Sequence, residues 1–152
     1  MYRYLVIIGV AAACMSGASS VLAADAAQME VNKKNVAAFY DAVLNQKDFD
    51  AASKYLGAGY KQHNPLANDG PEGLKGFIAF LKSKFPNNKS EIKRIFADGD
   101  YVIVHVHAVR EPGTRGNAII DIFRLDSAGK VVEHWDAVQP IPETALNNNG
   151  MF

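Results

Sequence analysis

A carboxylate and an imidazole on two neighbouring predicted strands are the first candidates for chemistry. Asn117 to Val138 alternates apolar and polar residues like two strands joined by a turn. Asp121 shares its strand face with isoleucine, phenylalanine and leucine side chains, and His134 shares its face with a valine. An ionisable group on such a face is costly to bury unless it pairs or does chemistry. We therefore predict that Asp121 and His134 belong to a functional site.

The register of this hairpin decides whether the two side chains meet. Asp126 to Gly129 supplies turn chemistry, because Asp and Ser bond the local backbone and Gly tolerates a positive φ. If these four residues form the loop, Leu125 pairs with Lys130. Counting back then sets Asp121 opposite His134. A register change of one residue would separate the two side chains.

Two further histidines lie on the preceding predicted strand. His105 and His107 share one face of that strand, which ends at Val109. If Val109 pairs with the next strand across the Pro-Gly loop, His107 lies opposite Asp121. His105 would then fall beside Phe123. The sequence therefore predicts histidine, aspartate and histidine in a row on three adjacent strands.

A loop between the second and third predicted helices could close over this row. His63 lies in that loop. The other residues predicted to line the same pocket are His105, Tyr60, Phe123 and Asp136. A carboxylate beside imidazoles in an apolar pocket suits general acid–base catalysis. Desolvation and mutual charge would move their pKa values toward the working range.

Two other roles remain open for these side chains. Asp121 could simply orient a histidine in a satisfied core network. Alternatively, His105 and His107 with His134 could hold a catalytic zinc ion, although Asp121 between the strands spoils a compact three-histidine face.

The sequence contains no Gly-rich phosphate loop, serine nucleophile elbow or dinucleotide fingerprint. We therefore expect no cofactor and no bound metal.

The N-terminal segment Met1 to Ala23 has the features of a secretory signal peptide. Arg3 gives it a positive start, the apolar run that ends at Cys14 is too short to span a bilayer, and small residues precede the predicted cleavage after Ala23. Lipidation at Cys14 is an alternative, although the residue three positions before it is a small alanine. We expect a periplasmic or secreted protein without a membrane span after cleavage.

The composition from Ala24 to Phe152 suits a single domain with one core. Removing Arg3 leaves 15 basic and 16 acidic residues, a net formal charge of −1, and no long basic run predicts a nucleic-acid partner. The single cysteine, Cys14, lies in the predicted signal. The mature chain therefore has neither a disulfide nor a thiol nucleophile.

Helical periodicity precedes strand periodicity along the chain, which predicts an α+β domain with a four-stranded antiparallel meander. The helices would cover one sheet face. The other face, rich in valine, would need a second copy of the chain, so we predict a homodimer through Val102, Val104, Val106, Ala108, Ile120 and Ile122. The predicted elements are a frayed lead-in over Ala24–Val31, helices over Asn32–Leu44, Phe49–Leu56 (N-capped by Asp48) and Pro71–Phe85, strands over Ser90–Ala97 and Tyr101–Val109 and within Asn117–Val138, and an irregular tail over Gln139–Phe152.

The combination of several short motifs resembles the SnoaL-like family. The matching stretches are Tyr60-Lys61-Gln62-His63-Asn64-Pro65, Asp69-Gly70-Pro71-Glu72-Gly73, Asp98-Gly99-Asp100-Tyr101-Val102, Asp121-Ile122-Phe123-Arg124, Gly129 through Asp136, Gln139-Pro140-Ile141-Pro142 and the Asn149-Gly150-Met151-Phe152 end. The family belongs to the nuclear transport factor 2-like superfamily, whose fold is a cone of helices against a curved sheet and which is usually dimeric. Its characterised members include polyketide cyclases that close a ring by aldol condensation without a cofactor.

The resemblance implies that Asp121 is the acid–base carboxylate and that His63, His107 and His134 line the pocket. From this we expect a cofactor-free lyase or isomerase acting on a small, largely apolar carbonyl compound. Asp121 would take a proton from the carbon next to the carbonyl, and His107 or His134 would be the catalytic histidine that donates to the enolate oxygen. The alternative is an exported protein that binds a small hydrophobic ligand without converting it.

Overall fold

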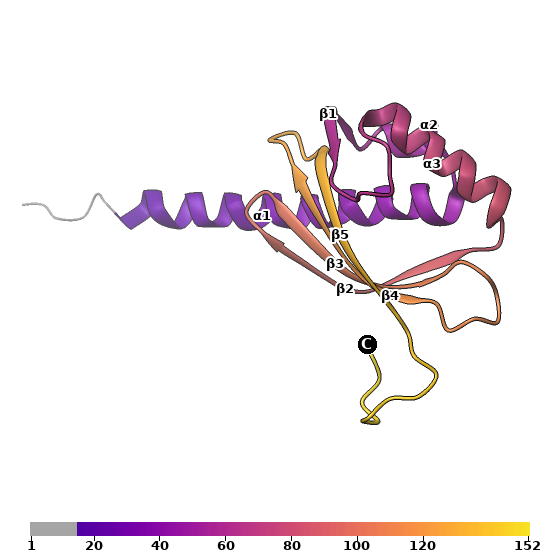
Figure 1. The fold of residues 1–152 in the computed structure, drawn as a ribbon. Coiled ribbons are helices and arrows are strands. Elements are labelled where there is room, and N and C mark those ends of the chain that lie inside the picture. The colour runs from indigo at the N-terminus through magenta and orange to yellow at the C-terminus, as the bar shows by residue number, and fades with distance from the viewer. Residues whose placement is uncertain (1–14) are drawn as a thin grey trace, which may run out of the picture.

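The computed structural model describes residues 15–152, which form helices packed on one face of a curved sheet (Figure 1). Residues 1–14, which include most of the predicted signal peptide and Cys14, lie outside the described range. The helices are α1 (Met15–Tyr40), the π-helical turn η1 (Asp41–Gln46), α2 (Phe49–Ser53) and α3 (Gly70–Lys84). Among the described residues, none of the helices is long and apolar enough to cross a membrane.

The first helix begins earlier than the sequence predicts. Ala24–Val31, predicted as a frayed lead-in, is helical and continuous with the rest of α1. This segment contains alanine, glutamine, methionine and glutamate, all of which favour helix, and it contains neither Gly nor Pro. The predicted N-cap of α2 is confirmed, because the side chain of Asp48 accepts a hydrogen bond of 3.0 Å from the Ala51 amide.

The sheet has five strands in the order β1-β5-β4-β3-β2. The four strands of the predicted meander are present as β2 (Lys89–Asp98), β3 (Tyr101–Val109), β4 (Asn117–Leu125) and β5 (Val131–Pro140). The fifth, β1 (Leu56–Gln62), differs from the prediction, which has a helix up to Leu56 and no strand directly after it. It lies at the sheet edge and pairs in parallel with β5.

The valine face of the sheet is the interior of the protein, so the prediction that it is exposed and covered by a second copy is wrong. Val104 on β3 is fully buried and packs in one core with Phe39 of α1 and Ile78 of α3. The outer face carries His105 and Ile120 instead. The sequence could not assign the faces, because β3 carries apolar residues on both of them.

The hairpin between β4 and β5 differs from the predicted register by two residues, because Asp136 rather than His134 lies opposite Asp121. Lys130 belongs to the loop, since its amide and that of Ala128 both donate to the Asp126 carboxylate at 2.9 Å. A bulge follows at the start of the ladder. A shift by an even number of residues keeps every side chain on its predicted face.

The register between β3 and β4 differs by three residues, because Val104 rather than His107 lies opposite Asp121. A shift by an odd number moves a whole strand's side chains to the other face. His105 and His107 therefore lie on the outer face, and the prediction that they flank Asp121 is wrong. The loop after β3 is longer than a tight Pro-Gly turn and ends at Gly116, so the strands pair from Ala108 with Asn117.

Two glycines should respond oppositely to alanine. Gly116 has a φ of +75°, and a Cβ there would collide with the carbonyl oxygen of Ala108, whereas a Cβ on Gly76 in α3 meets nothing within 4 Å. We expect Gly116→Ala to lower the free energy of unfolding by about 1–3 kcal/mol and Gly76→Ala to raise it by up to about 1 kcal/mol. Urea unfolding of both variants measures this, and equal effects would contradict the described loop conformation.

Candidate functional site

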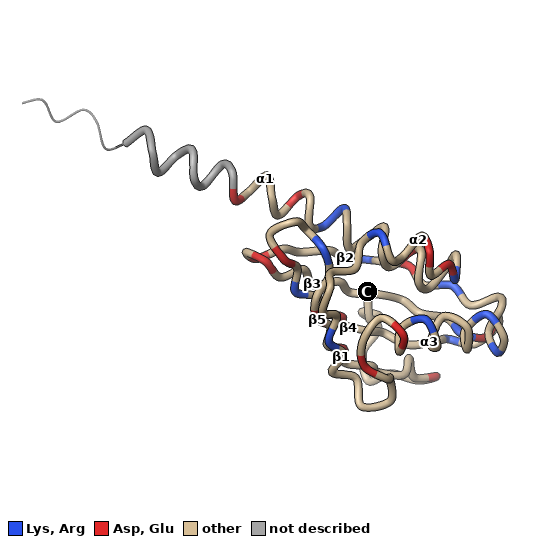
Figure 2. Tube along the Cα trace, turned by 90° about the horizontal axis from the view of Figure 1, so that it is seen from above, with Lys and Arg blue, Asp and Glu red and all other residues tan. Residues whose placement is uncertain are grey.

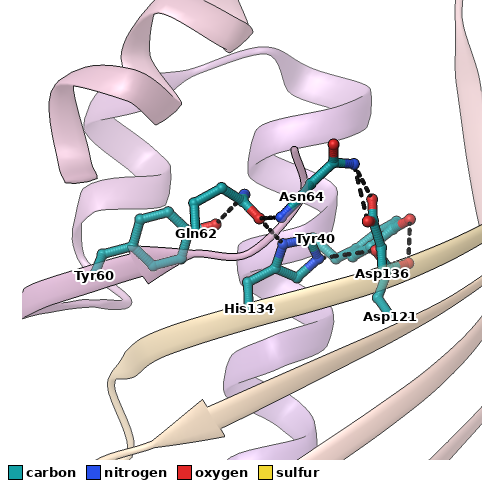
Figure 3. Close-up of polar contacts among 7 residues, drawn as sticks. All are labelled: Tyr40, Tyr60, Gln62, Asn64, Asp121, His134 and Asp136. Atoms are coloured by element: carbon teal, nitrogen blue, oxygen red, sulfur yellow. Dashed lines mark hydrogen bonds and ion pairs between the residues drawn. The ribbon is translucent and has the colours of Figure 1, made fainter. Parts of the chain in front are cut away.

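Asp121 lies at the centre of a polar network on the inner face of the sheet (Figure 3). Its side chain is only 7% exposed. The Tyr40 hydroxyl at the C-terminal end of α1 donates to Asp121 Oδ2 at 3.1 Å. His134 Nε2 lies 3.0 Å from Asp121 Oδ1, because His134 is the diagonal neighbour of Asp121 across the β4–β5 ladder. The predicted meeting of the carboxylate and the imidazole is thus found, by a different register.

The end of β1 and the loop after it supply the second half of the network. His134 Nδ1 lies 2.9 Å from Gln62 Oε1, and the Gln62 amide donates to the Tyr60 hydroxyl at 3.0 Å. The Asn64 amide donates to both carboxylate oxygens of Asp136, at 2.9 and 2.6 Å. Tyr60, Gln62 and Asn64 alternate along an extended segment, which directs all three toward the sheet interior (Figure 3).

Burial controls the ionisation of this network. Desolvation raises the pKa of Asp121 above its usual value, although the hydrogen bonds from His134 and Tyr40 oppose the shift. Burial, reinforced by the nearby Asp121 charge, raises the pKa of Tyr40 well above its usual range. Tyr40 therefore stays protonated and acts as a hydrogen-bond donor at physiological pH. A buried carboxyl group with a raised pKa, held between a tyrosine hydroxyl and an imidazole, is suited to accept and return a proton.

Three of the predicted site histidines lie elsewhere. His63 is on the opposite side of the β1 end, where its ring stacks on Trp135 at 4.7 Å and its Nε2 contacts Glu133 at 2.8 Å. His107 Nε2 donates to the Arg115 carbonyl oxygen at 2.8 Å on the outer face. His105 also lies there, with Nδ1 3.2 Å from Arg94.

The predicted pocket residues Tyr60, Phe123 and Asp136 do lie around Asp121. Phe123 is buried beside Asp121 on β4, with its ring 4.8 Å from that of His134. Asp136 lies directly opposite Asp121 in the ladder. These three residues, with Asp121 and His134, are the part of the predicted site that the structure brings together.

Sequence reasoning missed Tyr40, Gln62 and Asn64. Tyr40 continues the apolar pattern of the helix predicted over Asn32–Leu44, which is typical of a core residue. It is indeed buried, but its hydroxyl reaches Asp121. The signal for the other two was the alternation of polar side chains from Tyr60 to Asn64. That signal becomes readable only when this segment is recognised as a strand.

Two surface hollows lie away from this network. They have volumes of about 450 and 920 Å³ and linings that include His105 and His107 respectively, and neither is lined by Asp121 or His134. The side chains of Asn64 and Asp136, which border the network, are half-buried.

The predicted alternative of a zinc site on His105, His107 and His134 is excluded by the sheet faces. Within the described residues, ligand atoms of Asp121, His134 and Asp136 do lie within 4.8 Å of one another. Each of these side chains, however, has hydrogen-bond partners within the protein. The partners are Tyr40, Gln62 and Asn64, together with the contact between His134 and Asp121.

The helical layer on a curved five-stranded sheet, with ionisable residues on the inner face, defines the class of nuclear transport factor 2-like α+β cone proteins. Within that class the chain belongs to the SnoaL-like domain family, whose model matches residues 36–134. The expected fold and family are thus confirmed. Comparison with curated protein sequences gives no match.

Solved structures share the fold at low sequence identity. A SnoaL-like protein of unknown function from Burkholderia thailandensis is 17% identical, with a TM-score of 0.62 over 72% of this chain and 95% of that one. TsrD from Streptomyces laurentii is 20% identical, with a TM-score of 0.60 over 72% of this chain and 88% of that one. A candidate polyketide cyclase from Acidithiobacillus ferrooxidans is 21% identical, with a TM-score of 0.60 over 71% and 87% respectively.

Proposed function

We propose that the protein is a cofactor-independent acid–base enzyme that acts on a small apolar carbonyl compound, by a reaction of the aldol, lyase or isomerase type. The observation that carries the proposal is the buried Asp121 carboxyl group held between the Tyr40 hydroxyl and the His134 imidazole. Its raised pKa brings proton uptake closer to neutral pH. The fold shared with a candidate polyketide cyclase agrees with this class of reaction.

The proposed chemistry starts at the carbon next to the substrate carbonyl. Asp121, in its ionised form, takes a proton from this carbon as the C–H bond breaks. The electron pair moves onto the carbonyl oxygen and forms an enolate, which His134 stabilises by donating a hydrogen bond or a proton. The apolar rings of Phe39 and Phe123 on the inner face exclude water and strengthen these electrostatic contacts.

The charge distribution agrees with a small neutral ligand. Figure 2 shows basic and acidic residues interspersed over the helices and strands of the described chain rather than gathered by sign. Apolar and aromatic side chains surround Asp121 on the inner face. We therefore propose a ligand that is largely apolar and carries one carbonyl group for the network to recognise.

Solvent exchange tests the proposal without knowledge of the natural substrate. The protein, incubated in D₂O with a panel of small ketones and β-diketones, should accelerate deuterium incorporation at the carbon next to the carbonyl, as followed by proton NMR. The alternative is a protein that binds a hydrophobic ligand without converting it. That protein would give saturable ligand shifts without accelerated exchange, and this outcome across the panel would contradict the proposed enzyme.

We also propose that the protein is exported and cleaved after Ala23. The buried core side chains of α1 begin at Asn32, and in Figure 1 the earlier turns of the helix project beyond the sheet. Cleavage would therefore leave the core complete. The intact mass of protein recovered from the periplasm should correspond to a chain that starts at Ala24, and an uncleaved mass would contradict this proposal.

We propose a homodimer through the outer sheet face, now assigned to Ile120 and its neighbours. Ile120 is 40% exposed on this face. We expect Ile120→Asp to convert a dimer to a monomer without unfolding it, because a carboxylate would have to be buried at the interface. Size-exclusion chromatography with light scattering measures the mass. Thr114→Asp in the exposed loop is the control, and a monomeric wild-type protein at micromolar concentration would contradict the proposal.

A further inference from the structure

The orientation of the Gln62 side chain is determined by a neighbouring backbone amide. The Asn64 N–H lies 2.9 Å from one terminal atom of Gln62. A backbone N–H can only donate, so this atom is the carbonyl oxygen, Oε1. The Gln62 amide nitrogen consequently faces the Tyr60 hydroxyl, 3.0 Å away.

This orientation determines which nitrogen of His134 carries a proton. His134 Nδ1 lies 2.9 Å from the same Gln62 oxygen, which has no proton to give. Nδ1 must therefore be the donor. A neutral imidazole has only one N–H, so in the neutral form the lone pair of His134 is on Nε2, which faces Asp121 Oδ1 at 3.0 Å.

The contact between His134 and Asp121 then needs a shared proton. An unprotonated Nε2 and an ionised Oδ1 would both be acceptors, and two acceptors at 3.0 Å repel each other. One proton between them gives either an imidazolium–carboxylate pair or an imidazole–carboxylic acid pair. The other carboxylate oxygen, Oδ2, accepts from Tyr40 and does not supply this proton.

We propose that Gln62 is a positioning residue that fixes the Nδ1–H tautomer of His134 and so keeps one transferable proton between His134 and Asp121. This inference rests on the proposed acid–base function. Without the acceptor on Gln62, a neutral His134 would place its only proton on Nε2 and donate it to an ionised Asp121. The hydrogen bond between His134 and Asp121 would then form with one proton fewer on the two side chains together.

Two replacements of Gln62 with similar length act in opposite directions. Gln62→Met removes the acceptor, so the pair should lose its shared proton at a lower pH. Gln62→Glu keeps an oxygen that can accept from Asn64 N–H and from Nδ1, and its negative charge should hold the imidazolium to a higher pH. The titratable groups that face the pair are Tyr40 from α1, Tyr60 from β1 and Asp136 from β5. In addition, the carboxylate of Asp69 accepts a hydrogen bond from the backbone N–H of Gln62.

The test is long-range ¹H–¹⁵N NMR of the full protein labelled with ¹⁵N-histidine, with His134 assigned by comparison with His134→Asn. We expect a protonated Nδ1 in the wild type and in Gln62→Glu, and a shift of the proton to Nε2 in Gln62→Met. Deuterium exchange by Gln62→Met should fall at least tenfold. His63, the next residue on the opposite side of the strand end, is the internal control, because its resonances should not move.

An unprotonated Nδ1 in neutral wild-type His134, or the same tautomer in wild type and Gln62→Met, would overturn the inference. A merely structural role of Gln62 would shift the titration of both variants in the same direction and would also overturn it. If Gln62→Met does not fold, as judged by circular dichroism, two observations still test the inference. They are the tautomer of His134 in the wild type and the direction of the titration shift in Gln62→Glu. The NMR measurement uses no substrate, so the tautomer can be established even if deuterium exchange is absent and the proposed function fails.

Discussion

Replacing Asp121 with asparagine should slow deuterium exchange by at least about a hundredfold while leaving the protein folded. Asparagine has nearly the same shape but cannot accept a proton at neutral pH. Its amide could still donate to His134 Nε2, and its oxygen could still accept from Tyr40, so both contacts of the carboxylate have replacements. The measurement is the initial exchange rate with the most active compound of the panel, at matched protein concentration.

Asp136→Asn is the matched control for this experiment. Asp136 lies opposite Asp121 but is only half-buried, and its carboxylate contacts the Asn64 amide rather than Tyr40 or His134. We expect a smaller loss of exchange in this variant. An Asp121→Asn variant with the wild-type rate would remove Asp121 from the proposed mechanism.

Asp121→Asn should also change the free energy of unfolding by an amount that depends on pH. Because burial raises the pKa of Asp121 in the folded protein, the folded state favours the protonated carboxyl group. The associated stabilisation is present below the pKa of an unfolded aspartate, about 4, and is lost as the pH rises through the folded pKa. Thermal unfolding across this range should therefore show Asp121→Asn gaining stability relative to the wild type as the pH increases.

Phe39→Ala should lower the free energy of unfolding by about 3–5 kcal/mol. Phe39 is 3% exposed and its ring lies 6.0 Å from that of Phe123 and 6.5 Å from that of Tyr60. Alanine would leave a cavity directly below the polar network. We expect the midpoint of thermal unfolding to fall by roughly 10 °C or more.

Phe80→Ala is the control for this loss, because Phe80 is 44% exposed on α3 and its ring contacts that of Phe85. Its effect should stay below about 1 kcal/mol. A similar loss in both variants would mean that the core does not depend on Phe39. A loss of deuterium exchange in Phe39→Ala at temperatures where it remains folded would show that this ring also supports the position of Tyr60.

Much of the fold was predictable because its elements have strong local signals. The apolar periodicity of α3, the Asp48 N-cap and the alternation of β2 to β5 each identify an element without tertiary information. β1 was missed because two glycines in a short strand lack the side chains that show alternation. Its pairing partner, β5, is distant in the sequence, so no local turn predicts the contact.

The site was predicted only in part, because the pairing register of two strands is set by the length and conformation of the loop that joins them. Asp121 and His134 were correctly placed on the same face, since the unforeseen shift of their hairpin was even. His105 and His107 were placed on the wrong face, since the shift at the preceding loop was odd. Tyr40 and Gln62 reach Asp121 and His134 through contacts that only the packed tertiary structure defines.

The edge position of β1 has a consequence for how the protein could admit a ligand. β1 hydrogen-bonds to one neighbour only, and its register with β5 is interrupted between Leu56 and Lys61. Local opening costs least where a strand has few partners. Detachment of this strand would carry Gln62 and Asn64 away from the inner face and uncover Asp121 while the central strands stay paired. The free energy of such an opening would be set by the contacts of one edge strand rather than by the stability of the whole domain.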